Sequence, residues 1–253
     1  MDKSAAQTHS SNELPLLSNA FLLKVAIAVG ILALLSVVIN IAGRELGERL
    51  SRAGHSASTQ QFTVTIGQDH LTLAANTLRF EEQRRNGKTD RADLYFLWPD
   101  MSGYSAANSR SFNDVSQSDK LIFVQVSQST MSRDMSGRLE PIYAHLFEGE
   151  PEPANYGLTL HHLRAETGYG SEIMYTASSA GADDYAVRCL PPAANTTPSS
   201  GDCQRDIHVG RDLTVLYRFS SARLPEWHKL DNAIRSYFEA RLQNGSAKAS
   251  RLN

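Results

Sequence analysis

Two cysteines are the residues with the most distinctive chemistry in this 253-residue chain. Cys189 and Cys203 flank the Pro/Ser/Thr-rich segment LPPAANTTPSSGD, and each adjoins a strand-like run. This pattern predicts a disulfide that closes a ring of about 15 residues, for which the loop-closure model gives roughly 3 kcal/mol of stabilisation. Disulfides persist in the periplasm or outside the cell, so the pair favours an oxidising compartment. Two unpaired buried thiols in a cytosolic domain remain the alternative.

The eight histidines do not show the spacing of a metal site. His161 and His162 are adjacent, and neighbouring residues on a strand point to opposite faces, so both cannot bind one ion from a regular strand. The sequence contains no HExxH, no CxxC and no His/carboxylate cluster at ligand spacing. We therefore predict no metal and no cofactor, with one of these histidines facing water and the other bonded within a sheet.

The sequence also lacks the common motifs of catalytic and ion-binding loops. It has no GxSxG elbow, and the glycines of ETGYGSE precede β-rich residues instead of a phosphate-binding helix. Glu148, Glu150 and Glu152 have the charge of a calcium site without its spacing. We name no catalytic residue and favour a non-enzymatic protein, while an enzyme assembled from distant residues stays open.

One apolar run, FLLKVAIAVGILALLSVVINIA, occupies residues 21–42. As a helix it is about 33 Å long, enough to cross a hydrocarbon core of about 30 Å. We predict a single transmembrane helix. A cleaved signal peptide is the alternative, but the run exceeds the usual ~7–15 residues, and cleavage after Ala42 would place Asn40 where a small residue is needed.

Small residues form a stripe along this predicted helix. Ala26, Gly30 and Ala33 fall at i, i+4 and i+7, and Asn40 extends the same face. Such a stripe allows close approach of another helix, and the asparagine can hydrogen-bond across the contact. We predict helix pairing, with a second copy or with another membrane protein. The alternative is that Ala and Gly are simply common in membrane helices.

The charges that flank the run leave its orientation open. Lys3 and Lys24 precede it or lie near its start, and three arginines follow it within ten residues, which leans against export of the C-terminal part. Large domains, however, translocate largely regardless of flanking charge. The cysteine pair favours export, so we place residues 43–253 in the periplasm, with the helix in the inner membrane.

The remainder of the chain predicts an α+β, mainly β domain. About ten short apolar or alternating segments, among them 121–127 and RLEPIYAHLFE at 138–148, are separated by Gly-, Pro- or Asp-bearing turns, which is typical of antiparallel strands. Residues 224–243 then carry apolar side chains at helical spacing, which predicts a C-terminal amphipathic helix packed on the sheet. Its apolar positions are Trp227, Leu230, Ile234, Phe238 and Leu242.

These features predict five segments. They are a cytoplasmic tail (1–20), the transmembrane helix (21–42), a juxtamembrane helix or linker (43–60), the periplasmic β-rich domain with its C-terminal helix (61–243) and a disordered tail (244–253). The formal charge of −2 provides no overall basic field for nucleic acid. The expected partners are the lipid bilayer and another membrane or envelope protein, or a second copy of the chain.

Three stretches, IGQDHLTLAANTLRF, ADLYFLWPDMSGYS and CQRDIHVGRDLTVLYRF, followed by LPEW and a terminal helix, resemble single-span envelope proteins of α-proteobacteria. The resemblance covers most of residues 60–240. It implies a Gram-negative inner membrane and a periplasmic domain. That family has no assigned reaction, so the resemblance supplies no site residues.

We therefore expect a bitopic inner-membrane protein that presents a periplasmic interaction or scaffold domain as an accessory subunit of an envelope complex. The alternative is a membrane-tethered periplasmic enzyme or ligand-binding protein that acts on cell-wall or glycan material. Its cleft would be lined by residues 100–119.

Overall fold

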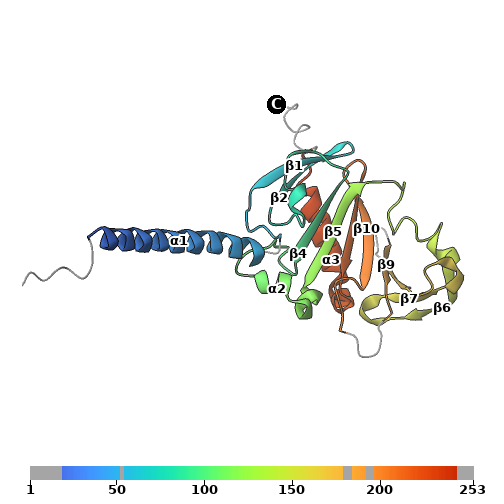
Figure 1. Cartoon of the computed structure of the whole chain (residues 1–253). Helices are drawn as coiled ribbons and strands as arrows, with labels where there is room; N and C mark the ends of the chain where they lie inside the picture. Colours follow the sequence, from blue (N-terminus) through green and yellow to red (C-terminus); the bar gives the residue numbers. More distant parts are fainter. Residues whose placement is uncertain (1–18, 52–53, 179–183, 192–196, 244–253) are drawn as a thin grey trace, which may run out of the picture. The chain divides into compact units, whose positions relative to one another are not determined.

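The computed structural model describes residues 19–51, 54–178, 184–191 and 197–243 (Figure 1). The chain divides into two compact units, Met1–Ala53 and Gly54–Asn253. The predicted tail 244–253, and all but the last two residues of the predicted tail 1–20, lie outside the described residues.

The first unit contains one long helix, α1 (Asn19–Ser51). Its stretch Asn19–Gly43 is long and apolar enough to cross a membrane, and all of its side chains are exposed. A helix that is apolar on every side is stable only where it is buried in protein or lipid. The described part of α1 therefore has the properties of a membrane anchor or a signal sequence.

The second unit begins with a three-stranded sheet in the order β2-β1-β3. β1 (Gln61–Ile66) and β2 (Asp69–Ala74) form the antiparallel hairpin that the alternating residues predict, and β3 (Gly87–Lys88) pairs with β1 in parallel. The hairpin turns at Gly67, whose φ of +55° suits glycine. Alternate side chains of the hairpin enter the core: Val64, Ile66, Leu71 and Leu73.

The larger sheet has eight antiparallel strands in the order β4-β5-β11-β10-β9-β8-β7-β6. After β5 the chain crosses to the far edge and returns strand by strand until β11 pairs with β5. The strands are β4 (Arg91–Leu97), β5 (Leu121–Gln128), β6 (Phe147–Pro153), β7 (Thr159–Leu163), β8 (Ile173–Ala177), β9 (Tyr185–Cys189), β10 (Cys203–Val209) and β11 (Leu213–Phe219).

Helix α3 (Trp227–Glu239) covers one face of this sheet (Figure 1). Leu230, Ile234, Tyr237 and Phe238 are buried, as expected for an amphipathic helix, and join one core with the small sheet and the large one. The ring of Tyr237 lies 4.5 Å from that of Phe96 on β4, edge to face. The predicted α+β, mainly β class with a C-terminal helix is confirmed.

The remaining helices are short. α2 (Ser109–Asn113) lies in the long connection between β4 and β5. Six 3-10 helices occur among the described residues: η1 (Glu81–Gln83), η2 (Val115–Lys120), η3 (Tyr143–Leu146), η4 (Asn155–Gly157), η5 (Ala165–Thr167) and η6 (Ser221–Glu226).

The strand predicted at 138–148 is wrong. The segment forms turns and η3, and only at Phe147 does β6 begin. Pro141 cannot donate to a ladder, and Tyr143 is instead buried in a second small core with Met135 and Met174. Packing on the far face of the sheet therefore overrides the strand-like pattern.

Candidate functional site

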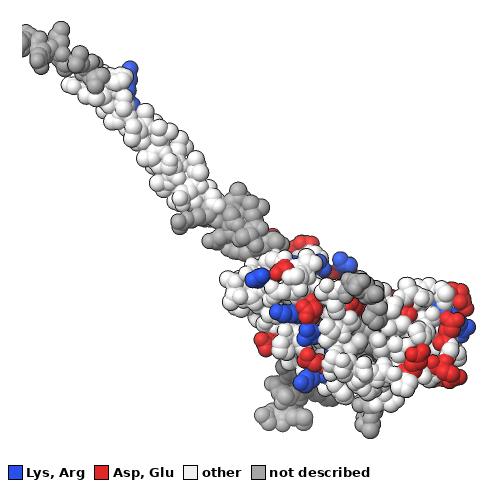
Figure 2. Space-filling view, turned by 90° about the horizontal axis from the view of Figure 1, so that it is seen from below, with Lys and Arg blue, Asp and Glu red and all other residues white. Residues whose placement is uncertain are grey.

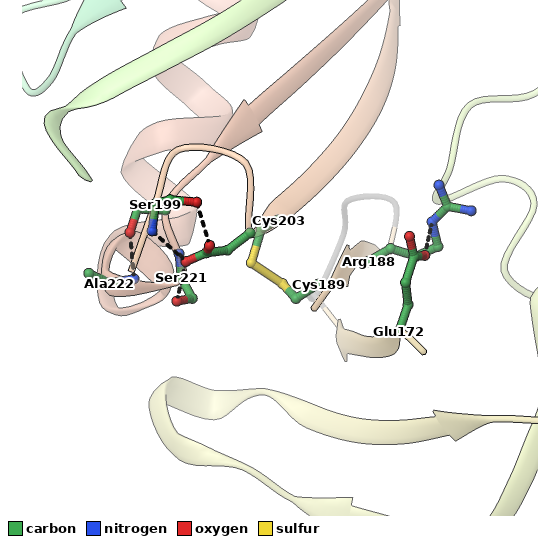
Figure 3. Close-up of a disulfide and its surroundings, with 9 residues drawn as sticks. Glu172, Arg188, Cys189, Ser199, Cys203, Ser221 and Ala222 are labelled. Atoms are coloured by element: carbon green, nitrogen blue, oxygen red, sulfur yellow. Dashed lines mark hydrogen bonds and ion pairs between the residues drawn. A yellow bond between two sulfur atoms is a disulfide. The ribbon is translucent and has the colours of Figure 1, made fainter. Parts of the chain in front are cut away.

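Cys189 and Cys203 form the predicted disulfide (Figure 3). They stand directly opposite each other on β9 and β10, with their Cα atoms 4.0 Å apart. Both are buried, at 2% and 0% exposure. Next to Cys203, Asp202 accepts hydrogen bonds from the Ser199 backbone N–H (2.9 Å) and the Ser221 hydroxyl (2.8 Å), which ties the end of the loop to η6. The crosslink is thus part of the core.

The disulfide lies at the weakest joint of the large sheet. β9 and β10 pair at two positions, Cys189↔Cys203 and Arg188↔Gln204, whereas β10 and β11 pair at seven. The covalent link therefore holds strands β6 to β9 against strands β4, β5, β11 and β10 at the point where the hydrogen-bond ladder is shortest.

Beyond these two pairs, Arg205 bridges the space between the diverging strands. Its Nη1 donates to the Ala186 carbonyl on β9 and to the Ser136 hydroxyl, both at 2.8 Å. Its Nε donates to Asp231 on α3 at 2.8 Å, and the Tyr217 hydroxyl donates to the same carboxylate oxygen at 2.6 Å. These four contacts join β9, β10, β11 and α3.

The charge state of this buried cluster follows from its contacts. Burial disfavours the charged form of Asp231, but the Arg205 charge and the hydrogen bonds from Arg205 and Tyr217 outweigh it and lower the pKa of the carboxyl. The Tyr185 ring lies 4.5 Å from the Arg205 guanidinium, and burial raises the pKa of its hydroxyl. A cluster this enclosed stabilises the joint between helix and sheet and offers no access to a substrate.

His161 and His162 point to opposite faces, as their adjacent positions require. His161 Nε2 lies 2.9 Å from the Thr176 hydroxyl, its ring stacks on Phe147, and burial lowers its pKa. The His162 side chain is 53% exposed and its Nε2 lies 3.6 Å from Glu152. Within the described part of the chain, no group of three or more His, Cys, Asp or Glu could hold a metal ion.

A serine–histidine pair escaped the sequence analysis. Ser129, just after β5, has its Oγ 2.9 Å from Nε2 of His208 on β10, beside a hollow of about 380 Å³ lined by residues 129–132 and 208–213. Nucleophilic catalysis requires that serine pass its proton to histidine and that a third group orient the ring. Here Ser129 donates to the Met131 carbonyl (2.6 Å), and Asp134 contacts the His208 backbone N–H (3.4 Å) instead of the ring.

Residues 79–91 carry charges of both signs, and several of the basic side chains make contacts within the domain. Arg84 donates to the carbonyls of Gly54 (2.7 Å) and Leu78 (3.1 Å), and Arg91 pairs with Asp93 at 3.1 Å. A hollow of about 430 Å³ on this run is lined by both signs of charge. The charged lining residues are Glu82, Arg85, Lys88, Asp90 and Arg91.

The acidic stretch at 148–152 lies on β6, the outermost strand of the large sheet. Figure 2 shows carboxylates gathered at this end of the domain. β6 carries Pro151 and Pro153, and its register with β7 is irregular between Glu148 and Glu152. Prolines, charges and bulges are the devices that protect an edge strand from pairing with another chain. This edge is therefore blunted against strand addition.

The predicted helix-packing residues Ala26, Gly30, Ala33 and Asn40 lie on α1 with their side chains exposed. A Cβ atom added at Gly30 would meet nothing within 4 Å. The stripe is free to contact another helix, and the pairing itself stays a prediction.

Comparisons with known proteins give little further information. No family model matches the chain, and no curated protein matches it. One similar solved structure is Smlt3025, an immunity protein of the Stenotrophomonas maltophilia type IV secretion system, with 18% identity, 72% of this chain and 93% of that chain covered, and a TM-score of 0.47. Another is the Neisseria meningitidis iron-regulated outer membrane lipoprotein FrpD, with 9% identity, 74% and 96% covered, and a TM-score of 0.41. Both likenesses are too loose to carry an inference about function.

Proposed function

We propose that this chain is a single-pass inner-membrane protein whose β-rich domain lies in the periplasm and acts as a non-catalytic accessory subunit of an envelope complex. One observation carries the proposal: a membrane-length apolar helix is followed in the same chain by a domain whose core contains a disulfide. Buried disulfides that join paired strands persist in oxidising compartments, and α1 supplies the tether. The resemblance of residues 60–240 to α-proteobacterial envelope proteins supports the choice of the inner membrane.

Two features favour the accessory role: the structural contacts of the buried charges and the exposed small-residue stripe of α1. The buried charges around Arg205 are fully engaged in joining α3 to the sheet. The small-residue stripe of α1 is exposed and suited to contact a second membrane helix. The chain thus combines a crosslinked sheet with a helix suited to pair within the bilayer.

The test is affinity purification of the tagged full chain from cross-linked membranes of its host, in mild detergent. We expect a membrane or envelope protein in fixed stoichiometry with the chain. Recovery of the chain without any such protein, from cells in which cross-linking of a known complex succeeds, would contradict the accessory role.

A tethered enzyme is the second candidate, because Ser129 and His208 meet beside a hollow. A fluorophosphonate probe separates the two functions, since it labels activated serines. The accessory role predicts no labelling of the full chain. Labelling that Ser129→Ala abolishes and that Ser132→Ala, in the same hollow, leaves intact would establish the enzyme.

A further inference from the structure

The large sheet has one face that α3 covers and an opposite face, part of which carries partly exposed side chains. We call the second face, over strands β4, β5, β11 and β10, the outer central face. Its middle is formed by Phe123 and Gln125 of β5 with Leu216 and Arg218 of β11. The register places Phe123 opposite Arg218 and Gln125 opposite Leu216, so the four side chains form a compact square.

These four side chains are accessible. Phe123, Gln125 and Leu216 are half-buried and Arg218 is exposed, whereas the alternate residues of the same strands, such as Val124 and Tyr217, are buried under α3. Phe123 and Leu216 occupy diagonal corners of the square, and their partly exposed side chains leave apolar area in water, which a partner surface can remove.

The charges of this face do not balance. Its strands contribute two carboxylates, Asp93 and Asp206, which are paired with Arg91 (3.1 Å) and Arg138 (2.5 Å). Within the described residues, Arg218 forms no ion pair, and neither does Arg79, which lies beside Phe123. The guanidinium groups of Arg79 and Arg218, one beside the square and one at its corner, therefore have no ion-pair partner among the described residues.

Arg79 is held in place by aromatic rings. Its guanidinium carbon lies 5.0 Å from the centre of the Phe123 ring and 5.2 Å from that of Phe80. Stacking on rings fixes the plane of the guanidinium and leaves its N–H groups free to bind a carboxylate. Arginine and aromatic side chains arranged in this way are typical of the energetically dominant positions of protein interfaces.

We propose that the outer central face docks an acidic protein partner that presents carboxylates to Arg79 and Arg218 around an apolar residue seated on Phe123 and Leu216. The inference rests on the proposed accessory role and names the surface and the partner chemistry that serve it. A protein fits better than a nucleic acid, because two unpaired cations around an apolar centre cannot follow a phosphate backbone.

The test uses the full chain in its host, with the photo-cross-linking amino acid p-benzoylphenylalanine in place of Gln125. Matched probes replace Glu150 on β6 and Lys229 on the exposed side of α3. Each probe is combined with the charge reversal Arg79→Glu plus Arg218→Glu. The control is the reversal Lys88→Glu plus Lys229→Glu. Where the probe itself occupies position 229, the control is Lys88→Glu alone. Lys88 and Lys229 are exposed cations away from the square.

We expect a discrete adduct from position 125 whose cross-linked peptide in the partner is rich in Asp or Glu. The reversal at Arg79 and Arg218 should weaken it at least tenfold, and the control reversal should not. An adduct that persists through the reversal, or adducts from position 150 or 229 with none from 125, would overturn this docking face and leave the accessory role standing. The absence of adducts from all three positions would contradict both.

Discussion

Asp69 and Asp212 lie at two different hairpin turns, and the carboxylate of each accepts backbone hydrogen bonds from the turn at which the other lies. Asp69, at the start of β2, accepts the N–H groups of Arg211 (2.9 Å) and Asp212 (3.1 Å) in the β10–β11 turn. Asp212 accepts the N–H of Gln68 (3.2 Å) in the β1–β2 turn. This reciprocal arrangement adds polar contacts to the apolar core that the small sheet and the large sheet share.

The two turns also require glycine, because each carboxylate fills the space where a side chain would begin. A Cβ atom on Gly210, whose φ is +68°, would lie 2.8 Å from Asp69 Oδ2. We predict that Gly210→Ala lowers the free energy of unfolding by about 3 kcal/mol, through positive-φ strain and loss of the hydrogen bonds to Asp69. Urea denaturation of the detergent-solubilised full chain measures it.

Gly168→Ala is the matched control. Gly168 has a φ of +77°, but a Cβ atom there would meet nothing within 4 Å. Gly168→Ala should lower the free energy of unfolding by about 1 kcal/mol, through the strain of a positive φ alone. Equal losses for the two variants would contradict the reciprocal role of Asp69.

The buried cluster at α3 gives a second prediction. Asp231→Asn removes the charge that faces Arg205, whose side chain is 4% exposed, and should destabilise the domain by about 3–5 kcal/mol. Replacing both partners, with Arg205→Met and Asp231→Leu, should cost less than Asp231→Asn alone, since no unpaired charge then stays buried.

Asp90→Asn, at an exposed carboxylate, serves as the control and should change stability by less than about 0.5 kcal/mol. Chemical denaturation of the four chains forms the comparison. A double variant that is less stable than Asp231→Asn would show that the cluster contributes more than charge compensation.

Stability should fall on mild acidification because of two histidines. Burial lowers the pKa of His55, with Arg84 and Arg79 adding to the shift and a hydrogen bond with Asn113 opposing it, and burial lowers that of His161. A histidine with a lowered pKa binds its proton more readily in the unfolded chain. The free energy of unfolding should therefore decrease as pH falls from about 6.5 towards the folded-state pKa values.

His55→Gln tests this assignment. His55 stacks on Tyr104, with ring centres 4.7 Å apart, and its Nδ1 lies 3.0 Å from the Tyr95 hydroxyl, so the variant is less stable at pH 7.5. Its further loss between pH 7.5 and 5.5 should nevertheless be smaller than that of the unmodified chain. The lowered pKa values of Asp202 and Asp231 act below about pH 4 and do not overlap this window. If the variant and the unmodified chain lose the same stability between pH 7.5 and 5.5, His55 is excluded as a cause of the pH dependence.

The small-residue stripe of α1 gives a prediction within the membrane. Gly30→Leu should weaken recovery of a second copy or a partner several-fold while insertion is unaffected, because the added side chain separates the helices, and a Cβ atom at this position would meet nothing within 4 Å. Ala28→Leu adds the same side chain on the opposite side of the helix and should have no effect. Equal recovery with both variants in quantitative co-purification would remove the stripe as an interface.

Local patterns in the sequence predicted those features that neighbouring residues determine. The β1–β2 hairpin follows from alternation around Gly67, and α3 follows from apolar spacing. The disulfide followed from Cys189 and Cys203 flanking one loop. In contrast, the pairing of β5 with β11, the Ser129–His208 contact and the meeting of Asp69 with Asp212 join residues about 80 to 140 positions apart. No local pattern encodes such contacts, since they arise when the sheets assemble. The strand prediction at 138–148 was wrong for the same reason, because the local sequence does not encode the packing of Tyr143 with Met174.

The location of the β-rich domain is the central claim, and one experiment on intact cells tests it directly. Cells with a permeabilised outer membrane and an intact inner membrane are treated with protease and with a membrane-impermeant thiol reagent, followed by non-reducing mass spectrometry. We predict that the domain is digested and that the peptides of Cys189 and Cys203 are recovered linked and unmodified. A protected domain whose two cysteines are free thiols once the inner membrane is opened would place it in the cytoplasm and contradict the account.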